Sequence, residues 1–377
     1  MPPLLSIGIP TFNRAHLLKH LLRNLAHQCS SIGDEVEIVV SDNCSDDDTA
    51  DLVDSYRGQL RIRYHRNDRN IGPAANVVLV PSLASGQYCW MFGDDDLLVP
   101  GALAEVLRLL REHPGIPAIV VGYSYQQEAN RADYLSPDSP IVFERPVFRT
   151  TAPPRMLARW EDTFFEADKA ALHTSIVSCV FARHEWEGHA AAFESLPTVE
   201  SLTSLDSTFP QAIIWSSFLV GRPVLFAPVP LVYFFVGAQE WFKPKWLTIV
   251  FVFCLELAQH FRRQGATEAA VRHYESLLLR HAGLAALVVT PNEFAQAHFS
   301  LYKLVRDYGA RDEIWDNLAL TARRLPCRLQ LSLVIRCLRA SVPAPRTWRR
   351  CLVTLWGILT NSLASCMTRV AKRSLAR

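Results

Sequence analysis

Three consecutive carboxylates, Asp94–Asp96, follow the short apolar segment Gln87–Phe92 and Gly93. Adjacent ionised carboxylates repel each other, and burial beside a strand worsens the repulsion because carboxylates are costly to desolvate. A divalent cation relieves it, and such hard oxygen ligands suit Mg²⁺ or Mn²⁺. A cation held by one or two carboxylates can also bind a nucleotide diphosphate. The triplet therefore indicates chemistry on a phosphorylated donor. The alternative is a solvated acidic turn or the cap of a helix predicted over Leu97–Leu110.

The elements that position this triplet alternate between strand and helix. Apolar segments predict strands at 4–10, 36–40, 60–65 and 87–92, and leucines at helical spacing predict a helix between the first two strands. Each strand is followed by a polar segment; these are Thr11–Arg14, Ser41–Thr49, Asn70–Asn76 and the aspartates. In open α/β sheets, ligands bind outside the carboxyl ends of the strands. The four polar segments are thus expected to share one edge.

The rest of the chain is less regular. Strands are predicted at 116–121 and 174–181, a helix from Asp206 to about Val220, and two strands within 223–236 joined at Pro228. Residues 126–165 are rich in proline, which predicts a loop region that could form a flap over the donor. Helical spacing recurs at 246–258, 266–280 and 291–308.

The order of the polar motifs resembles that of family-2 glycosyltransferases of GT-A fold. The matching segments are Ile9–Arg14, Ser41–Thr49, Asn70–Gly72 with Asn76, and Gly93–Asp96. The Phe-Gly-Asp-Asp-Asp form is most similar to the branch that contains abequosyltransferases and similar O-antigen enzymes. The resemblance is strong over residues 4–100, extends to about 245, and is absent beyond.

The resemblance implies a role for each motif. Asp94 and Asp96 match the Asp-x-Asp pair that holds the metal, Mn²⁺ or Mg²⁺, under the diphosphate, with Asp95 beside it in the nucleotide site. Asp42 matches the carboxylate that accepts a hydrogen bond from the base of the donor. The other expected nucleotide-binding residues are Pro10, Thr11, Arg14, Asn43, Ser45, Asn70 and Asn76. For several of these the alternative is a turn residue or a helix cap.

In inverting members of this family a carboxylate near the start of the later helix deprotonates the acceptor hydroxyl, which is otherwise a poor nucleophile. Asp206 is the candidate base, with Glu200 and Glu194 in reserve; a helix N-cap is the alternative for Asp206. Many relatives also have a metal- or phosphate-binding histidine after the last core strand. This chain has Gln239–Trp241 there, so a third protein ligand to the metal is in doubt.

The charge is unevenly distributed along the 377 residues. Residues 317–377 contain twelve Lys or Arg and no Asp or Glu, so the net charge of +2 leaves −10 for residues 1–316. The basic side chains alternate with aliphatic ones, which favours a helix in the interface of an anionic membrane over nucleic-acid binding. The alternative is a core helix with a solvated basic face. Nine scattered cysteines suit a reducing compartment, and the start has neither a basic nor a long apolar segment that would indicate a secretory signal. Together with the basic tail, this predicts a cytoplasmic protein, peripheral on the inner face of the cell membrane.

These observations predict an α/β protein. A GT-A-type nucleotide-binding domain with a mixed, mostly parallel sheet would occupy 1–242, with a donor half (1–100) and an acceptor half (101–242). An all-helical region (243–316) and a basic amphipathic tail (317–377) would follow. The expected function is metal-dependent, inverting transfer of a hexose or deoxyhexose from a nucleoside-diphosphate sugar to a lipid-linked glycan. The alternatives are a non-catalytic, membrane-associated nucleotide-sugar-binding protein and a sugar-nucleotide pyrophosphorylase. The pyrophosphorylase is disfavoured because Pro10–Arg14 has no glycine.

Overall fold

The computed structural model describes residues 2–148, 150, 152–167, 170–190, 193, 203–237, 249–280, 304, 307–308, 311 and 314–316. The chain divides into two compact units. The first comprises Met1–Lys243 and Glu256–His273, and the second comprises Pro244–Leu255 and Tyr274–Arg377. The predicted tail at 317–377 and the segment 239–241 lie outside the described residues.

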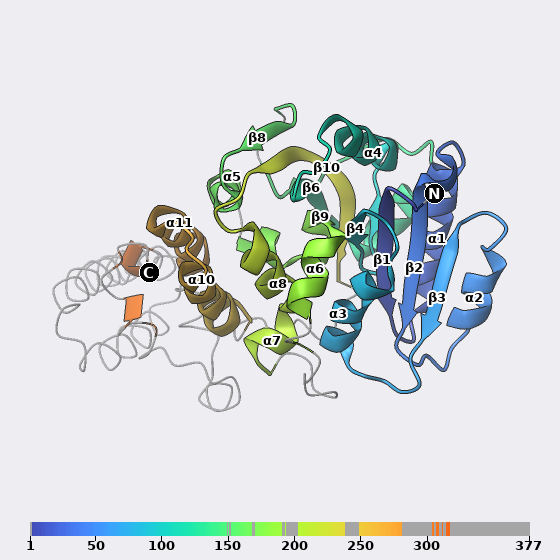
Figure 1. Ribbon diagram of the computed structural model, residues 1–377, viewed down its shortest axis with the longest axis horizontal. Coiled ribbons are helices and arrows are strands. Elements are labelled where there is room, and N and C mark those ends of the chain that lie inside the picture. The colour runs from blue at the N-terminus through green and yellow to red at the C-terminus, as the bar shows by residue number, and fades with distance from the viewer. Residues whose placement is uncertain are drawn as a thin grey trace, which may run out of the picture. The chain divides into compact units, whose positions relative to one another are not determined.

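A mixed ten-stranded sheet forms the centre of the first unit (Figure 1). Its main path runs β3-β2-β1-β4-β9-β6-β10-β5, with β7 paired to β6 and β8 to β10. The strands are β1 (Leu5–Thr11), β2 (Val36–Asp42), β3 (Ile62–Arg66), β4 (Tyr88–Met91), β5 (Leu97–Leu98), β6 (Ala118–Gln127), β7 (Arg145–Pro146), β8 (Arg155–Leu157), β9 (Cys179–Ala182) and β10 (Val224–Val236). The GT-A-type fold predicted from the sequence is confirmed.

Parallel pairing of β3, β2, β1 and β4 determines where the site lies. In register, Thr11 at the end of β1 pairs with Asp42 at the end of β2, which pairs with Arg66 at the end of β3. The polar segments after these strands therefore meet at one edge of the sheet, as parallel topology requires.

Helices cover the sheet (Figure 1), and the apolar side chains of its strands are buried. Leu18, Leu21, Leu22 and Leu25 of α1 are fully buried, and the leucines of α4 pack in the same way. The longer helices of this part of the chain are α1 (Ala15–Cys29), α2 (Thr49–Ser55), α3 (Pro73–Leu83), α4 (Ala102–Glu112), α6 (Arg183–Ala190) and α8 (Pro210–Leu219).

The predicted helix over Leu97–Leu110 is wrong in its first turn. Leu97 and Leu98 form β5, which pairs antiparallel with Val232 and Tyr233 of β10. The helix α4 begins only at Ala102, after Pro100 and Gly101. Pairing with a strand distant in the sequence therefore overrides the local helical spacing of the leucines.

Two strand predictions in the second half of the sheet are corrected. Of residues 174–181, the first part forms short 3₁₀ turns, η4 (Ala170–Thr174) and η5 (Ile176–Ser178), before β9 begins at Cys179. Residues 224–236 form one strand, β10, where two were predicted. Its prolines are accommodated by a register shift between Ala227 and Pro230. The partner strand has glycine there; a Cβ at Gly122 would lie 2.2 Å from the Pro228 carbonyl oxygen.

The helix predicted from Asp206 to Val220 is two helices. A single turn, α7 (Leu205–Thr208), precedes α8, and Phe209 between them has the non-helical angles φ −132° and ψ 51°. Proline disfavours the helical conformation of the residue before it, and Pro210 follows Phe209. The helix α7 contacts α3, and Figure 1 shows both along the lower side of the view.

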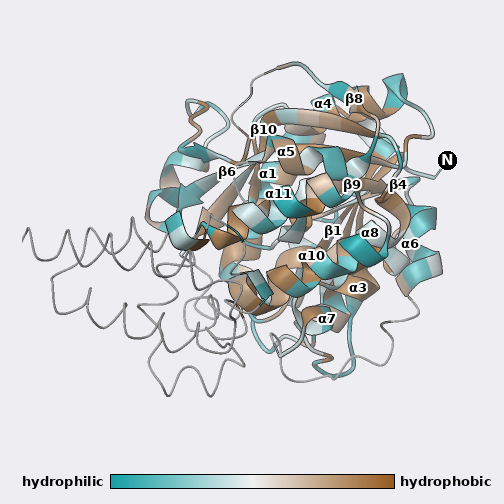
Figure 2. Ribbon diagram, turned by 90° about the vertical axis from the view of Figure 1, so that its left-hand side faces the viewer, coloured by the Kyte–Doolittle hydropathy of each residue, from teal (hydrophilic) through white to brown (hydrophobic). Residues whose placement is uncertain are grey.

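The described part of region 243–316 is helical, as predicted. It contains a π-helical turn (Ile249–Phe253), α10 (Cys254–Arg263) and α11 (Glu268–Leu279). Both α-helices carry apolar and polar faces (Figure 2). In the part of the chain that can be described, none of the helices combines the length and apolarity that a membrane crossing needs.

Candidate functional site

The aspartate triplet lies at the carboxyl end of β4 and is buried. Asp94, Asp95 and Asp96 are only 2%, 5% and 1% exposed. This excludes the solvated acidic turn that the sequence left open. Buried carboxylates need compensating charges or hydrogen bonds, so their partners define what the site can do.

The end of β1 supplies the first partners. The Thr11 hydroxyl donates to Asp94 Oδ2 at 2.8 Å. The Arg14 guanidinium forms ion pairs with Asp94 Oδ1 at 2.7 Å and Asp95 Oδ2 at 2.8 Å. Thr11 and Arg14, two of the predicted nucleotide-site residues, are thus in direct contact with the predicted metal-binding turn.

Burial disfavours the charged forms of Asp94 and Asp96. Burial raises the pKa of Asp94 to about 7, against a smaller lowering by Arg14. Burial, and then the neighbouring charge of Asp95, also raises the pKa of Asp96 well above its usual range. Asp96 Oδ1 accepts a hydrogen bond from the Phe235 backbone N–H at 3.2 Å. A bound cation would favour the charged forms of both carboxylates.

The donor set fits a divalent cation bound mainly through a substrate. Asp94 Oδ1 is buried and has no hydrogen bond apart from its ion pair with Arg14. A Cβ at Gly93 would lie 2.7 Å from Asp95 Oδ1 and 2.9 Å from Asp96 Oδ2, so glycine leaves these oxygens room to approach. Within the described ranges, no three His, Cys, Asp or Glu side chains are grouped to hold a metal. Mg²⁺ commonly takes one or two carboxylates and fills its remaining positions with phosphate and water.

Asp42 lies at the end of β2 and is fully buried. Its Oδ1 accepts the Ser45 N–H at 2.9 Å, and its Oδ2 accepts the Tyr64 hydroxyl at 2.6 Å. Arg66 Nε lies 3.7 Å from the same Oδ2. Burial and this carboxylate together raise the pKa of Tyr64. A carboxylate has about four acceptor positions, so Asp42 retains capacity for one more donor.

Four asparagines join the segments after β2 and β3. Asn43 donates to Asn70 at 2.8 Å and accepts from Asn67 at 3.1 Å and from the Ile71 N–H at 2.9 Å. Asn76, at the start of α3, donates to the Ser41 carbonyl and accepts from the Ser41 hydroxyl. Asn70 also caps Gly72. These amides fix the loops, and Asn43 and Asn76 are almost fully enclosed.

The first and second strand loops are also joined. The Asn13 N–H donates to Ser45 Oγ at 2.9 Å, and the Asp46 N–H donates to Asn13 Oδ1 at 2.7 Å. Pro10 pairs in register with Ser41 on β2. The structure therefore brings together all of the predicted nucleotide-site and metal residues along one edge. We call Pro10–Arg14, Ser41–Ser45, Asn67–Asn76 and Gly93–Asp96 the polar edge.

Asp206 is placed differently. It is exposed in the first turn of α7, whose N-cap is Ser204. This excludes Asp206 as the N-cap, a role that the sequence had left open. The described contacts do not connect Asp206 with the carboxylate turn. The reserve candidates Glu194 and Glu200 lie outside the described residues.

Several residues of the site were not predicted from the sequence. Arg131 belongs to the 3₁₀ segment η2 (Glu128–Tyr134), inside the region predicted as a loop, and its Nη2 donates to the Asp95 carbonyl at 2.6 Å. Tyr64 and Asn67 contact the predicted residues Asp42 and Asn43. Their place at the end of the third strand was the available signal. Nothing in the local sequence pointed to Arg131.

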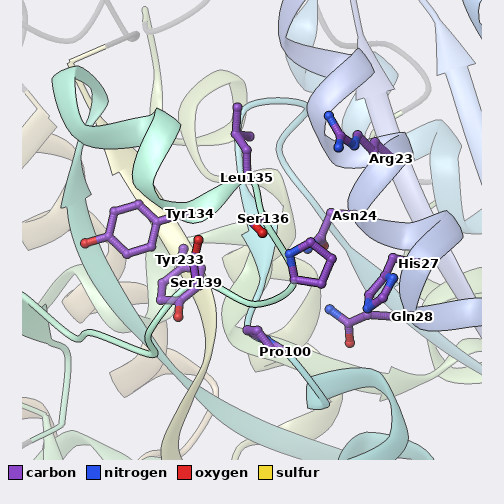
Figure 3. Close-up of a pocket in the computed structure, with 11 residues that line it drawn as sticks. Arg23, Asn24, His27, Gln28, Pro100, Tyr134, Leu135, Ser136, Ser139 and Tyr233 are labelled. Atoms are coloured by element: carbon purple, nitrogen blue, oxygen red, sulfur yellow. The ribbon is translucent and has the colours of Figure 1, made fainter.

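A cavity of about 180 Å³ lies beside η2 (Figure 3). Arg23 and His27 of α1 form one wall, and Tyr134 and Tyr233 form another. Tyr134 also packs against Phe235, the residue whose backbone binds Asp96. The cavity therefore lies next to the second layer of side chains around the carboxylate turn.

Part of the chain matches a known protein family. The model of the family described as "Glycosyl transferase family 2" matches residues 6–181, which include the whole polar edge. The resemblance predicted from the motifs is confirmed over this span.

Individual relatives match shorter segments. The abequosyltransferase RfbV of Salmonella typhimurium is 42% identical over 103 residues, 27% of this chain and 31% of that protein. The validoxylamine A glucosyltransferase of Streptomyces hygroscopicus subsp. jinggangensis is 53% identical over 62 residues, 16% and 14% of the two chains. A GalNAc(5)-diNAcBac-PP-undecaprenol beta-1,3-glucosyltransferase of Campylobacter jejuni is 35% identical over 112 residues, 29% and 35%. The chain thus spans between 14% and 35% of the length of these relatives.

Among solved structures, residues 1–349 of S. aureus TarS superpose with a TM-score of 0.50 at 16% identity. The match covers 94% of this chain and 91% of that chain. A structure of the same protein with UDP also superposes with a TM-score of 0.50. At this identity the likeness is one of fold.

Proposed function

We propose that this protein is a glycosyltransferase that moves a sugar from a nucleoside diphosphate to a hydroxyl group of a lipid-linked glycan. The observation that carries the proposal is the buried carboxylate turn at the polar edge, held by Thr11 and Arg14 beside Asp42. The family match over residues 6–181 supports it. The names of relatives that act on O-antigen or undecaprenol-linked sugars favour the acceptor class.

Binding of the donor follows from the charges at the polar edge. Asp94 and Asp96 would hold Mn²⁺ or Mg²⁺, whose charge offsets that of the diphosphate. Arg14, which is paired with Asp94 and Asp95, would bind phosphate when the cation takes over these carboxylates. Asp42 would accept a hydrogen bond from the base, and Asn43, Ser45, Asn70 and Asn76 keep the surrounding loops in place.

The transfer step requires one proton acceptor. The acceptor oxygen forms a bond to the anomeric carbon while the bond from that carbon to the diphosphate oxygen breaks, and the hydroxyl proton passes to a carboxylate. We assign this base to Asp206, whose exposed position leaves it open to an acceptor. A single displacement of this kind inverts the anomeric configuration.

The location of the protein completes the proposal. The twelve basic residues of 317–377 would hold it at the inner face of an anionic membrane, where a lipid-linked acceptor is found. The described helices α10 and α11 precede this segment in the chain.

The test is a panel of UDP-, GDP-, CDP- and dTDP-sugars incubated with the purified protein, with Mn²⁺ or with EDTA. We expect one donor to release its nucleoside diphosphate faster with Mn²⁺, and release to accelerate when membrane lipid extract supplies acceptors. Binding of a donor without any release would support the non-catalytic alternative. No binding of any donor would refute the proposal.

A further inference from the structure

Arg131 is buried at the carboxylate turn, although a guanidinium is one of the groups least often enclosed. The residue is only 6% exposed. It reaches the turn from η2, which follows β6, and so comes from a different part of the sheet than Thr11 and Arg14.

Three contacts hold the Arg131 guanidinium in place. Its Nε and Nη2 pair with Glu128 at 2.6 and 2.7 Å. Its carbon Cζ lies 4.0 Å from the centre of the Phe235 ring. Its Nη2 also donates to the Asp95 carbonyl at 2.6 Å. Because Phe235 donates its own N–H to Asp96, Arg131 and Phe235 both contact the carboxylate turn.

One nitrogen of this group is left over. Nη1 is buried and has no hydrogen-bond partner. An enclosed charged donor without a partner is costly, and guanidinium groups bind phosphate oxygens in a geometry that suits them well. Both terminal nitrogens of Arg14 are paired with carboxylates, whereas Nη1 of Arg131 has no hydrogen-bond partner among the described residues.

We infer that Arg131 is a second phosphate-binding arginine of the donor site, whose Nη1 donates a hydrogen bond to an oxygen of the donor's diphosphate. The inference rests on the proposed function, since it needs a nucleoside diphosphate in the polar edge. It assigns a binding role to a segment whose sequence indicates only a loop. It also explains why the guanidinium is fixed by Glu128 and Phe235 before the ligand arrives, because a fixed group loses little freedom on binding.

The experiment compares nucleoside diphosphates with their nucleosides by calorimetry in the presence of Mn²⁺. UDP, GDP, CDP and dTDP, each paired with its nucleoside, are titrated into the wild type and Arg131→Gln. We expect the variant to bind the preferred diphosphate about 10- to 100-fold more weakly, which is the range for a lost hydrogen bond to a charged group. Affinity for the nucleoside, which carries no phosphate, should change less than about threefold.

Two further variants separate binding from folding. Arg131→Lys keeps the charge but not the forked geometry, so it should lose less affinity for the diphosphate than Arg131→Gln. Arg57→Gln removes an exposed arginine that follows α2, away from the polar edge, and should bind like the wild type. Circular dichroism and melting temperature establish that each variant is folded before it is titrated.

The outcomes are distinct. Unchanged affinity for the diphosphate in both Arg131 variants would overturn the inference. An equal loss for diphosphate and nucleoside would also overturn it, because that pattern belongs to a residue that only supports the fold. If the wild type binds none of the four diphosphates, the proposed function itself fails.

Discussion

The polar edge and the surroundings of Asp206 belong to the same compact unit but differ in how their acidic groups are held. Asp42 is fully buried, and Asp94–Asp96 are at most 5% exposed. Each has partners from at least one other strand or loop. Asp206 is exposed on the single turn α7. Burial with cross-strand partners preorganises the polar edge for a charged donor. Among the described residues, the side chain of Asp206 has no such partners, so binding of the acceptor would have to position it as a base.

The largest effect should come from removing a carboxylate of the turn. Asp96→Ala is expected to lower transfer by about 10³-fold or more, because it removes charge stabilisation of the departing diphosphate. Turnover of the preferred donor measures this, with Asp138→Ala, an exposed acid of the η2–β7 loop, as the control. If Asp96→Ala stays within a few-fold of the wild type and EDTA is harmless, the polar edge does not act through a metal.

Asp206→Asn tests whether the exposed carboxylate on α7 is the general base. Loss of a general base should lower the rate by roughly 10²–10⁴-fold while donor affinity stays the same. Asp138→Asn again serves as the control. Full activity in Asp206→Asn together with an inactive Glu200→Gln or Glu194→Gln would move the base to the segment before α7 and leave the mechanism intact.

A smaller effect is expected at Asp42. Asp42→Ala should weaken nucleotide binding by about 1–3 kcal/mol, the cost of leaving a buried hydrogen-bond partner unpaired. Asp46→Ala, in the same loop but exposed, should bind normally. Tyr64→Phe removes one bond to Asp42 and keeps the carboxylate. If calorimetry gives normal affinity for Asp42→Ala with only a lower melting temperature, Asp42 has a purely structural role.

Each basic residue of 317–377 should have a smaller effect, on membrane binding, than the substitutions above have on activity or nucleotide binding. Each Lys or Arg near an anionic surface contributes about 1 kcal/mol, falling off within a Debye length. The protein should therefore sediment with anionic vesicles, less with neutral ones, and be partly released by salt. Truncation after Asp316 should spare donor hydrolysis and reduce transfer to a lipid-linked acceptor. A full-length protein that sediments with neither kind of vesicle would refute the membrane role.

The sequence was most informative where local pattern and topology agree. Apolar segments ended by Pro10, Asp42 and Gly93 predicted β1, β2 and β4 and the edge where their polar residues meet. The local pattern led to a wrong prediction where pairing with a distant strand determines the structure, as for Leu97, which pairs with β10. Arg131 could not be predicted for the same physical reason. Its partners include a backbone carbonyl and the Phe235 ring, and neither contact leaves a motif in the chain.

The most direct test of the account is the linkage between metal and diphosphate at the polar edge. Calorimetric titration of the preferred nucleoside diphosphate into the wild type and Asp96→Asn, each with Mn²⁺ and with EDTA, measures it. We predict that Mn²⁺ strengthens binding to the wild type by at least about tenfold, or about 1.4 kcal/mol, and leaves the variant unchanged. Equal affinity with and without Mn²⁺ in the wild type would contradict the account.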